Sequence, residues 1–308
     1  PHGVRMNRLT SVVVAVDFSP CSFSALTTAA RLARRDGATL HVLHVVETLA
    51  VSDLAEALGM SDGAVRELAE DDATEAIQAE LARIEAPTGI HIDVSFGAPQ
   101  REIRRVVEDV QADLLVMGVH GHEGGGKGVG TFATRAIRNA PVDVLLVREG
   151  QDGPFTHVLT CTDFSETARR AVARGVSVAT RDQARFTLLH VFWGPWHRLS
   201  YRTQPPAASP EYRVEYMTLL RSRLARESAE HAEALAGIEH ADELFDASHY
   251  GEAIARFEKE SGADLVVLGT RGRTNLRDVF LGSTAERVLR QTNCSLLAVK
   301  PADVIGDR

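Results

Sequence analysis

Cysteine is scarce in this chain of 308 residues, and acidic residues outnumber basic ones. The three cysteines, Cys21, Cys161 and Cys294, lie far apart, and their spacing matches neither a disulfide framework nor a zinc site. A chain without structural disulfides is typical of a reducing compartment, so we expect a cytoplasmic protein. The net charge of −8 offers no basic surface to phosphate backbones or anionic lipids. We therefore expect neither a nucleic-acid partner nor a membrane partner.

Long hydrophobic runs are also missing. No apolar stretch approaches the ~20 residues that cross a bilayer, and the N-terminal segment lacks the apolar core of a signal peptide. The composition is that of a globular protein, with 44% apolar and 25% charged residues. At about 150 residues per domain, this length predicts two domains that each bury a core of their own.

The sequence repeats itself after about half its length. Val-Asp-Phe-Ser at 16–19 returns as Thr-Asp-Phe-Ser at 162–165, and Leu-His-Val at 43–45 returns at 189–191, both at an offset of 146 (163 − 17 and 190 − 44). Ala-Asp-Leu-Leu-Val-Met-Gly, ending at Gly118, returns as Ala-Asp-Leu-Val-Val-Leu-Gly, ending at Gly269, at an offset of 151 (269 − 118). Such a repeat predicts two domains of one fold, which we place at residues 8–149 and 154–302.

Strand-like and helix-like segments alternate in each half. The strands read as continuous β-branched runs, the pattern of a parallel sheet buried on both faces. We expect strands at 11–16, 39–46, 91–96, 113–117, 142–147, 157–162, 185–192, 243–247, 264–268 and 295–299, and helices at 19–35, 52–85, 100–111, 131–139, 166–180, 211–236, 252–260 and 285–290. The helix at 52–85 is either continuous or broken near residues 60–63. This alternation predicts an α/β fold of two tandem, doubly wound parallel five-stranded sheets, Rossmann-like or flavodoxin-like, with strand order 3-2-1-4-5.

In such sheets, ligands bind at the carboxyl ends of the strands, where the strand order reverses. In the second half those strands end at Asp163 and Gly269, and Gly269 begins a motif that continues with Gly272, Gly282, Ser283 and Thr284. Glycine lets a ligand approach the main chain, Ser and Thr are good N-cap residues, and the N–H groups of a helix start attract anions. The helix dipole supplies only ~0.3–1 kcal/mol, whereas a micromolar ligand needs about 8 kcal/mol. Several N–H groups and a buried base must therefore act together.

These residues resemble the universal stress protein family in its tandem two-domain form. The spacing G-x2-G-x9-G-[ST] of its nucleotide-binding subgroup is met in full from Gly269 to Ser283. The resemblance implies a cytoplasmic stress-response regulator that binds ATP, assisted by Mg²⁺, and at most hydrolyses it slowly. It implies that Asp163 binds ribose or adenine with Thr162 beside it, and that the main chain of Val191 reads the adenine edge. Arg271 would contact the phosphates, which would be cradled by Gly282, Ser283 and Thr284.

The first half departs from that pattern. Only eight residues separate Gly121 from Gly130, His120 stands in place of the arginine, and Phe132 stands in place of Thr284. The loop between them contains several further glycines, and fixing its flexible backbone costs ~1–2 kcal/mol of conformational entropy per residue. We expect the first domain to bind a nucleotide more weakly, or to bind a different ligand. The candidate residues there are Asp17, Val45, Gly118, Gly121, Gly130 and Thr131.

Several features also have structural interpretations. Asp17 and Asp163 could cap the helices that follow them, and His44 and His190, within apolar strands, read as structural. Two histidines, His120 and His122, are a weak metal signal without a third ligand. The tryptophans at 193 and 196 either anchor a partner or pack the segment that contains them.

Catalysis is not predicted, because neither a catalytic triad nor a pair of carboxylates recurs in both halves. The rival to a nucleotide-binding regulator is a ligand-free scaffold. The strands at 142–147 and 295–299 would be sheet edges, which can pair with a regulatory protein or with a second copy in a homodimer.

Overall fold

The computed structural model describes residues 8–121, 129–198, 209–272 and 281–305, and the chain divides into two compact units. The first comprises Pro1–Gly153 with Asp303–Arg308, and the second comprises Pro154–Ala302. Each unit is described separately below. No helix in the described ranges is long and apolar enough to cross a membrane.

The first domain alternates strands and helices from its start. Its elements are β1 (Ser11–Ala15), α1 (Pro20–Asp36), β2 (Thr39–Val46), α2 (Thr48–Leu58), α3 (Asp62–Leu81), β3 (Ile90–Phe96), α4 (Pro99–Asp109), β4 (Leu114–Gly118), α5 (Thr131–Asn139) and β5 (Asp143–Val147). Of the two alternatives for 52–85, the broken helix is found, because Gly59 adopts a left-handed conformation (φ 64°) and Ser61 caps a new helix.

The second domain repeats this order. Its elements are β6 (His157–Cys161), α6 (Glu166–Asp182), β7 (Arg185–Phe192), α7 (Pro195–Arg198), α8 (Pro210–Ala229), β8 (His240–Asp246), α9 (Tyr250–Ser261), β9 (Leu265–Gly269), α10 (Ser283–Gln291) and β10 (Ser295–Val299). A short α11 (Ala302–Ile305) follows. The helix expected to reach residue 236 ends at Ala229, and turns follow it.

Both sheets are parallel and have the predicted strand order. The order is β3-β2-β1-β4-β5 in the first domain and β8-β7-β6-β9-β10 in the second. The order therefore reverses between β1 and β4 and between β6 and β9, as expected. β5 and β10 each come last in the strand order of their own domain. The doubly wound α/β fold predicted from the repeat is confirmed.

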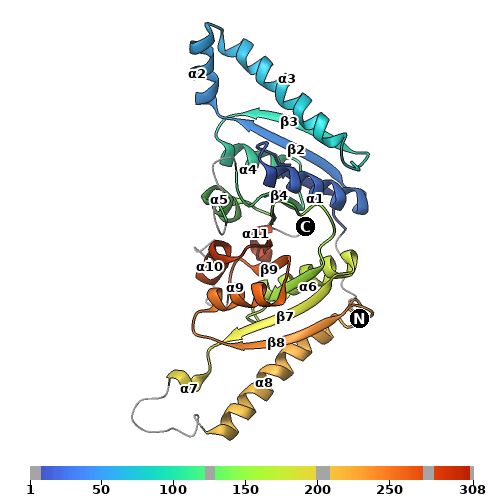
Figure 1. The fold of residues 1–308 in the computed structure, drawn as a ribbon, viewed down its shortest axis with the longest axis vertical. Coiled ribbons are helices and arrows are strands. Elements are labelled where there is room, and N and C mark those ends of the chain that lie inside the picture. The colour runs from blue at the N-terminus through green and yellow to red at the C-terminus, as the bar shows by residue number, and fades with distance from the viewer. Residues whose placement is uncertain (1–7, 122–128, 199–208, 273–280, 306–308) are drawn as a thin grey trace. The chain divides into compact units, whose positions relative to one another are not determined.

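The cores form because the central strands are apolar on both faces. Val12, Val13 and Val14 of β1 are fully buried, as are Leu265, Val266 and Val267 of β9. In the first domain α1 packs against β1 and β4, and α4 packs against β2. In the second, α6 packs against β6 and β9. Figure 1 shows α3 along β3 and α8 along β8, so these helices cover the outer strands.

A side-chain tether joins the first and fourth strands of each sheet at their amino ends. Asp113 Oδ2 accepts hydrogen bonds from the Thr10 N–H (2.6 Å) and hydroxyl (2.8 Å). Asp264 Oδ2 does the same for the N–H and hydroxyl of Thr156, both at 2.7 Å. Both tethers therefore fix the register of the two strands between which the strand order reverses, at the end of the sheet opposite to their carboxyl ends.

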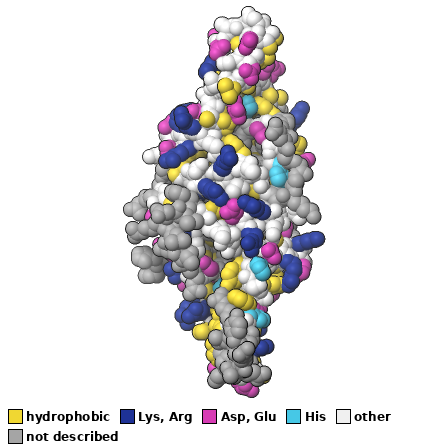
Figure 2. Space-filling model, turned by 90° about the vertical axis from the view of Figure 1, so that its left-hand side faces the viewer, with side chains coloured by type: hydrophobic (Ala, Val, Ile, Leu, Met, Phe, Trp, Pro, Cys, Tyr) yellow, Lys and Arg dark blue, Asp and Glu magenta, His cyan; other side chains and the backbone are white. Residues whose placement is uncertain are grey.

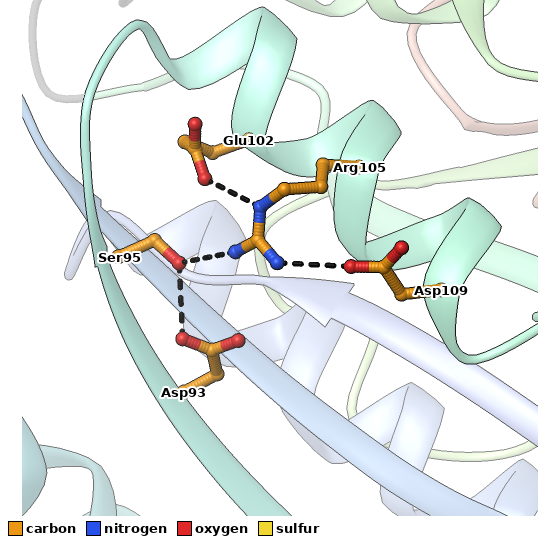
Figure 3. A network of polar contacts seen from close by, with 5 residues as sticks. All are labelled: Asp93, Ser95, Glu102, Arg105 and Asp109. Carbon is orange, nitrogen blue, oxygen red and sulfur yellow. Dashed lines mark hydrogen bonds and ion pairs between the residues drawn. The ribbon is translucent and has the colours of Figure 1, made fainter.

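The outer strand of the first domain is tied to its helix by a charged network. Arg105 of α4 donates to Glu102 (2.8 Å), Asp109 (3.0 Å) and Ser95 (3.1 Å), and Ser95 donates to Asp93 of β3 (Figure 3). Hydrogen bonds to the carboxylates raise the pKa of Arg105, led by that of Glu102. Charged side chains along an outer strand discourage pairing with another chain. On the face drawn in Figure 2, acidic and basic side chains both occur.

Close packing of α6 against β6 should make Gly175 intolerant of a side chain. A Cβ there would lie 2.0 Å from Oγ1 of Thr160, whose side chain is fully buried. We expect Gly175→Ala to lower the free energy of unfolding by ~1–3 kcal/mol, measured by denaturant titration.

The matched control is Gly63→Ala in exposed α3. The added Cβ meets only Ser61 Oγ, at 3.9 Å, so this variant should gain ~0.4–1 kcal/mol through a less flexible unfolded chain. Equal effects of the two substitutions would contradict the packing argument.

Candidate functional site

The turn after the first strand of the second domain holds Asp163 in a defined orientation. Asp163 Oδ1 accepts a hydrogen bond from the N–H of Ser165 (3.0 Å), and Phe164 between them adopts φ 64°. Positive φ is rare for a bulky residue and tends to be found at functional sites. The N-cap of α6 is Ser165, whose side chain accepts from Ala168 N. Asp163 therefore shapes the turn but does not cap the helix.

The first domain builds the same turn. Asp17 Oδ1 accepts from the N–H of Ser19 (3.1 Å), Phe18 has φ 64°, and Ser19 caps α1 by accepting from Ser22 N. The capping interpretation of both aspartates is thus replaced by a turn interpretation in both halves. A single turn geometry presents an aspartate at the reversal point of each sheet.

A histidine on the neighbouring strand supports each turn. His190 Nδ1 lies 2.8 Å from the carbonyl oxygen of Thr162, and its ring packs on Phe164 with centroids 4.4 Å apart. His44 makes the same contacts with the Val16 carbonyl oxygen (2.8 Å) and Phe18 (4.6 Å). Because a carbonyl only accepts, Nδ1 carries the proton in both rings. These contacts agree with the structural interpretation of the two histidines.

The start of the glycine motif lies against Asp163. A Cβ at Gly272 would be 2.9 Å from Asp163 Oδ2, so the second carboxylate oxygen faces the loop while the first holds the turn. Gly269 has a different role, since a Cβ there would meet Thr167 Cγ2 at 3.0 Å where β9 passes α6. The strand order and the glycine spacing each predicted a ligand position in this domain, and the contact between Gly272 and Asp163 shows that the two positions coincide. Residues 273–280 of the motif lie outside the described ranges.

The motif ends where α10 begins. Gly282 is the N-cap, with no side-chain hydrogen bond, and its N–H donates to the Thr270 carbonyl at 2.8 Å. Ser283 and Thr284 are therefore the first helical residues, not the caps that their side chains suggested. Gly282 leaves room, because an added Cβ would approach only Thr270 O, at 3.6 Å. The first-turn N–H groups of α10 have no capping side chain, which is how a helix presents donors to an anion.

Two further predicted residues of the second domain occupy the same end of the sheet. Val191 is the penultimate residue of β7, and Leu189 two positions earlier accepts from the N–H of Thr162 (2.9 Å). Arg271 lies between Thr270 and Gly272, at the exit of β9, and is half-buried. The carboxyl ends of β6, β7 and β9 thus bring together Val191, Arg271 and Asp163.

Sequence reasoning missed the partner of Thr162. The hydroxyl of Thr162 donates to Glu227 Oε2 (2.9 Å) and accepts from the N–H of Phe164 (3.0 Å), so Thr162 buttresses the turn. Glu227 on α8 is only 6% exposed. Burial raises the pKa of the Glu227 carboxyl, while the Thr162 hydrogen bond and the charge of Arg169 oppose that rise. The sequence signal that could have revealed this contact is a glutamate at helical spacing from Leu220 and Leu224, on the apolar face of α8.

The aromatic residues after β7 pack among themselves. Trp196 is 8% exposed and lies against Phe192 and Leu220, with Tyr216 edge-on at 5.7 Å between ring centroids. Trp193 stacks on His197 with centroids 6.4 Å apart. Of the two interpretations of the tryptophans, packing accounts for Trp196.

The first domain has a cavity of about 270 Å³ at the corresponding position. Five of the six residues predicted for this domain line it, namely Asp17, Val45, Gly118, Gly121 and Gly130. The sixth, Thr131, begins α5 beside it without lining it. As in the second domain, the second glycine abuts the aspartate, since a Cβ at Gly121 would be 2.6 Å from Asp17 Oδ2. Among the described residues, no group of three His, Cys, Asp or Glu side chains could hold a metal ion.

Fold and site together define a tandem protein of two doubly wound α/β domains, each with an aspartate turn facing a glycine-bordered helix start. The model of the Universal stress protein family matches residues 9–148 and again 154–300. The chain therefore belongs to the universal stress protein family and carries two of its domains.

Similar proteins agree with this assignment. The "Universal stress protein in QAH/OAS sulfhydrylase 3'region" of Thermus aquaticus is 31% identical over 150 residues, 47% of this chain and 99% of the relative. The Universal stress protein E homolog of Haemophilus influenzae is 49% identical over 51 residues, 17% of this chain and 16% of that protein. A universal stress protein structure from Archaeoglobus fulgidus superposes with a TM-score of 0.66 at 21% identity, covering 94% of this chain and 98% of the other. That last likeness concerns the fold.

The buried Glu227 should make stability depend on pH. Its pKa is raised in the folded chain, so the folded state favours the protonated carboxyl. The free energy of unfolding should therefore fall as pH rises from the unfolded-state pKa of ~4.3 through the raised folded-state pKa. Glu227→Gln stays neutral and still accepts from Thr162. This variant should be more stable than the wild type at pH 7 and equal to it near pH 4, in denaturant titrations across that range.

The control for that experiment is Glu233→Gln, an exposed site on the same stretch of chain. It should leave the pH profile unchanged. A Glu227→Gln profile parallel to the wild type would show that this carboxyl titrates alike in the folded and unfolded chain.

Proposed function

We propose that this protein is a stress-response regulator whose second domain binds an adenine nucleotide, with ATP as the preferred ligand. The observation that carries the proposal is the close approach of Asp163 to Gly272, where an added Cβ would lie 2.9 Å from Asp163 Oδ2. The start of α10, whose N-cap makes no side-chain hydrogen bond, follows in the same motif. A carboxylate and a cluster of N–H donors, close together at the reversal point of a parallel sheet, suit a ribose joined to phosphates.

Each group has a chemical task in this arrangement. Asp163 Oδ2 accepts hydrogen bonds from the ribose hydroxyls or the adenine amine, because its Oδ1 is committed to Ser165. The main chain of Val191 bonds the adenine edge. N–H groups from Gly282, Ser283 and Thr284 bind phosphate oxygens, and Arg271 neutralises their charge. Hydrogen bonds to charged groups contribute ~1.5–3 kcal/mol each, so a few of them with a buried base reach micromolar affinity.

Mg²⁺ fits this site as a companion of the phosphates. Mg²⁺ in nucleotide sites is held by phosphate oxygens and water with one or two carboxylates, so it needs no dedicated protein cage. In this proposal Asp163 supplies the carboxylate.

Isothermal titration calorimetry with ATP and Mg²⁺, on the 308-residue chain cleared of bound ligand, tests the proposal. Wild-type protein should bind, and Gly272→Ala should weaken second-domain binding about tenfold or more (~1.4 kcal/mol), because its methyl displaces the Asp163 carboxylate. Asp163→Asn keeps an oxygen for the Ser165 N–H but loses the charge and one acceptor. It should also weaken binding.

Gly153→Ala is the matched control, since nothing lies within 4 Å of a Cβ there. It should bind as the wild type does. Wild-type protein that fails to bind ATP at millimolar concentration would refute the proposal and favour the scaffold, which associates through end strands.

A further inference from the structure

The cavity of the first domain combines the aspartate turn with a different lining. Its apolar wall includes Leu43, Ile103, Met117 and Phe132. Its volume of about 270 Å³ is just below the ~300–1,000 Å³ typical of sites for drug-sized ligands. The cavity therefore suits one small, partly apolar molecule.

Three lining residues change its charge and shape relative to the second domain. At the shared repeat offset of 146, Glu47 corresponds to Trp193 (193 − 47). At the offset of 151, His120 corresponds to Arg271 (271 − 120). The first domain thus gains a carboxylate and loses a guanidinium at positions that line the cavity.

Phe132 changes the place where phosphates would bind. It is the second residue of α5, the position that Thr284 holds on α10, and its ring lines the cavity while remaining 40% exposed. Gly130, the N-cap of α5, has no side-chain hydrogen bond. The α5 start alone would favour an anion, but the dipole effect is small and confined to the first turn. Glu47, which has no carboxylate counterpart in the second domain, lines this cavity, and together with Phe132 it disfavours a polyphosphate.

The donors and acceptors that remain suit sugar hydroxyls. Asp17 fixes one oxygen on Ser19 and turns the other toward Gly121. A carboxylate at the end of a strand in a doubly wound sheet is the group that binds ribose hydroxyls. The apolar wall of Met117, Ile103 and Phe132 offers a flat ring a dry surface. We propose that the first domain binds an unphosphorylated purine nucleoside and discriminates against its phosphate esters.

This proposal concerns a different site from the nucleotide site of the second domain, so the two can be tested separately. In the Gly272→Ala background, which impairs the second site, calorimetry with adenosine reports on the first domain. Adenosine should bind, and adenosine monophosphate and ATP should each bind at least ~10-fold more weakly. Asp17→Asn should weaken adenosine about 10-fold while keeping the turn to Ser19.

Changing the charges that line the cavity should reverse the discrimination against phosphate esters. Glu47→Gln combined with His120→Arg should improve the affinity for adenosine monophosphate by about 10-fold or more relative to the affinity of the same variant for adenosine. Glu56→Gln, an exposed carboxylate of α2 that does not line the cavity, should change neither. Circular dichroism and thermal melts establish that each variant is folded.

Three results would overturn the inference. The first is no adenosine binding at millimolar concentration in any background. The second is tighter binding of ATP than of adenosine when the second site is impaired. The third is binding of an organic amine such as putrescine in the absence of adenosine binding, which would identify the two carboxylates as a cation site.

Discussion

The structure depends on the turn that follows the first strand of each sheet. Phe18 and Phe164 hold a positive φ of 64°, a conformation that costs a bulky residue of the order of 1–3 kcal/mol. The aspartate hydrogen bonds, the histidine that packs at a tilt against each phenylalanine and the serine cap of the next helix offset that cost together. Because the turn joins the strand at the reversal point to its helix, it fixes a carboxylate where a ligand can reach it.

The two domains show how one scaffold can carry different chemistry. Their strand order, turns and amino-end tethers are the same, and so are the contacts of the second motif glycine with the aspartate. What differs is the lining, where Val16 in one domain corresponds to Thr162 with its buried Glu227 partner in the other. Since ligand choice follows lining and not fold, the repeat predicts architecture far better than it predicts ligands.

The sequence could predict the topology because apolar runs and an internal repeat are strong signals. It could also predict that Asp163 meets the glycine motif, because carboxyl ends of parallel strands share one edge. It could not place the N-cap at Gly282, since Ser283 and Thr284 compete for that position on propensity alone. Nor could it pair Thr10 with Asp113, or Thr162 with Glu227, because those contacts depend on how distant elements meet.

The histidine contact also fixes the tautomer of each ring. Nδ1 of His44 and of His190 donates to a main-chain carbonyl, so the proton of each neutral ring lies on Nδ1. An apolar side chain in place of either histidine could still pack on the phenylalanine, but it would withdraw the donor from the carbonyl oxygen of Val16 or Thr162. Shape alone is therefore not sufficient at these two positions, where the ring must also supply an N–H.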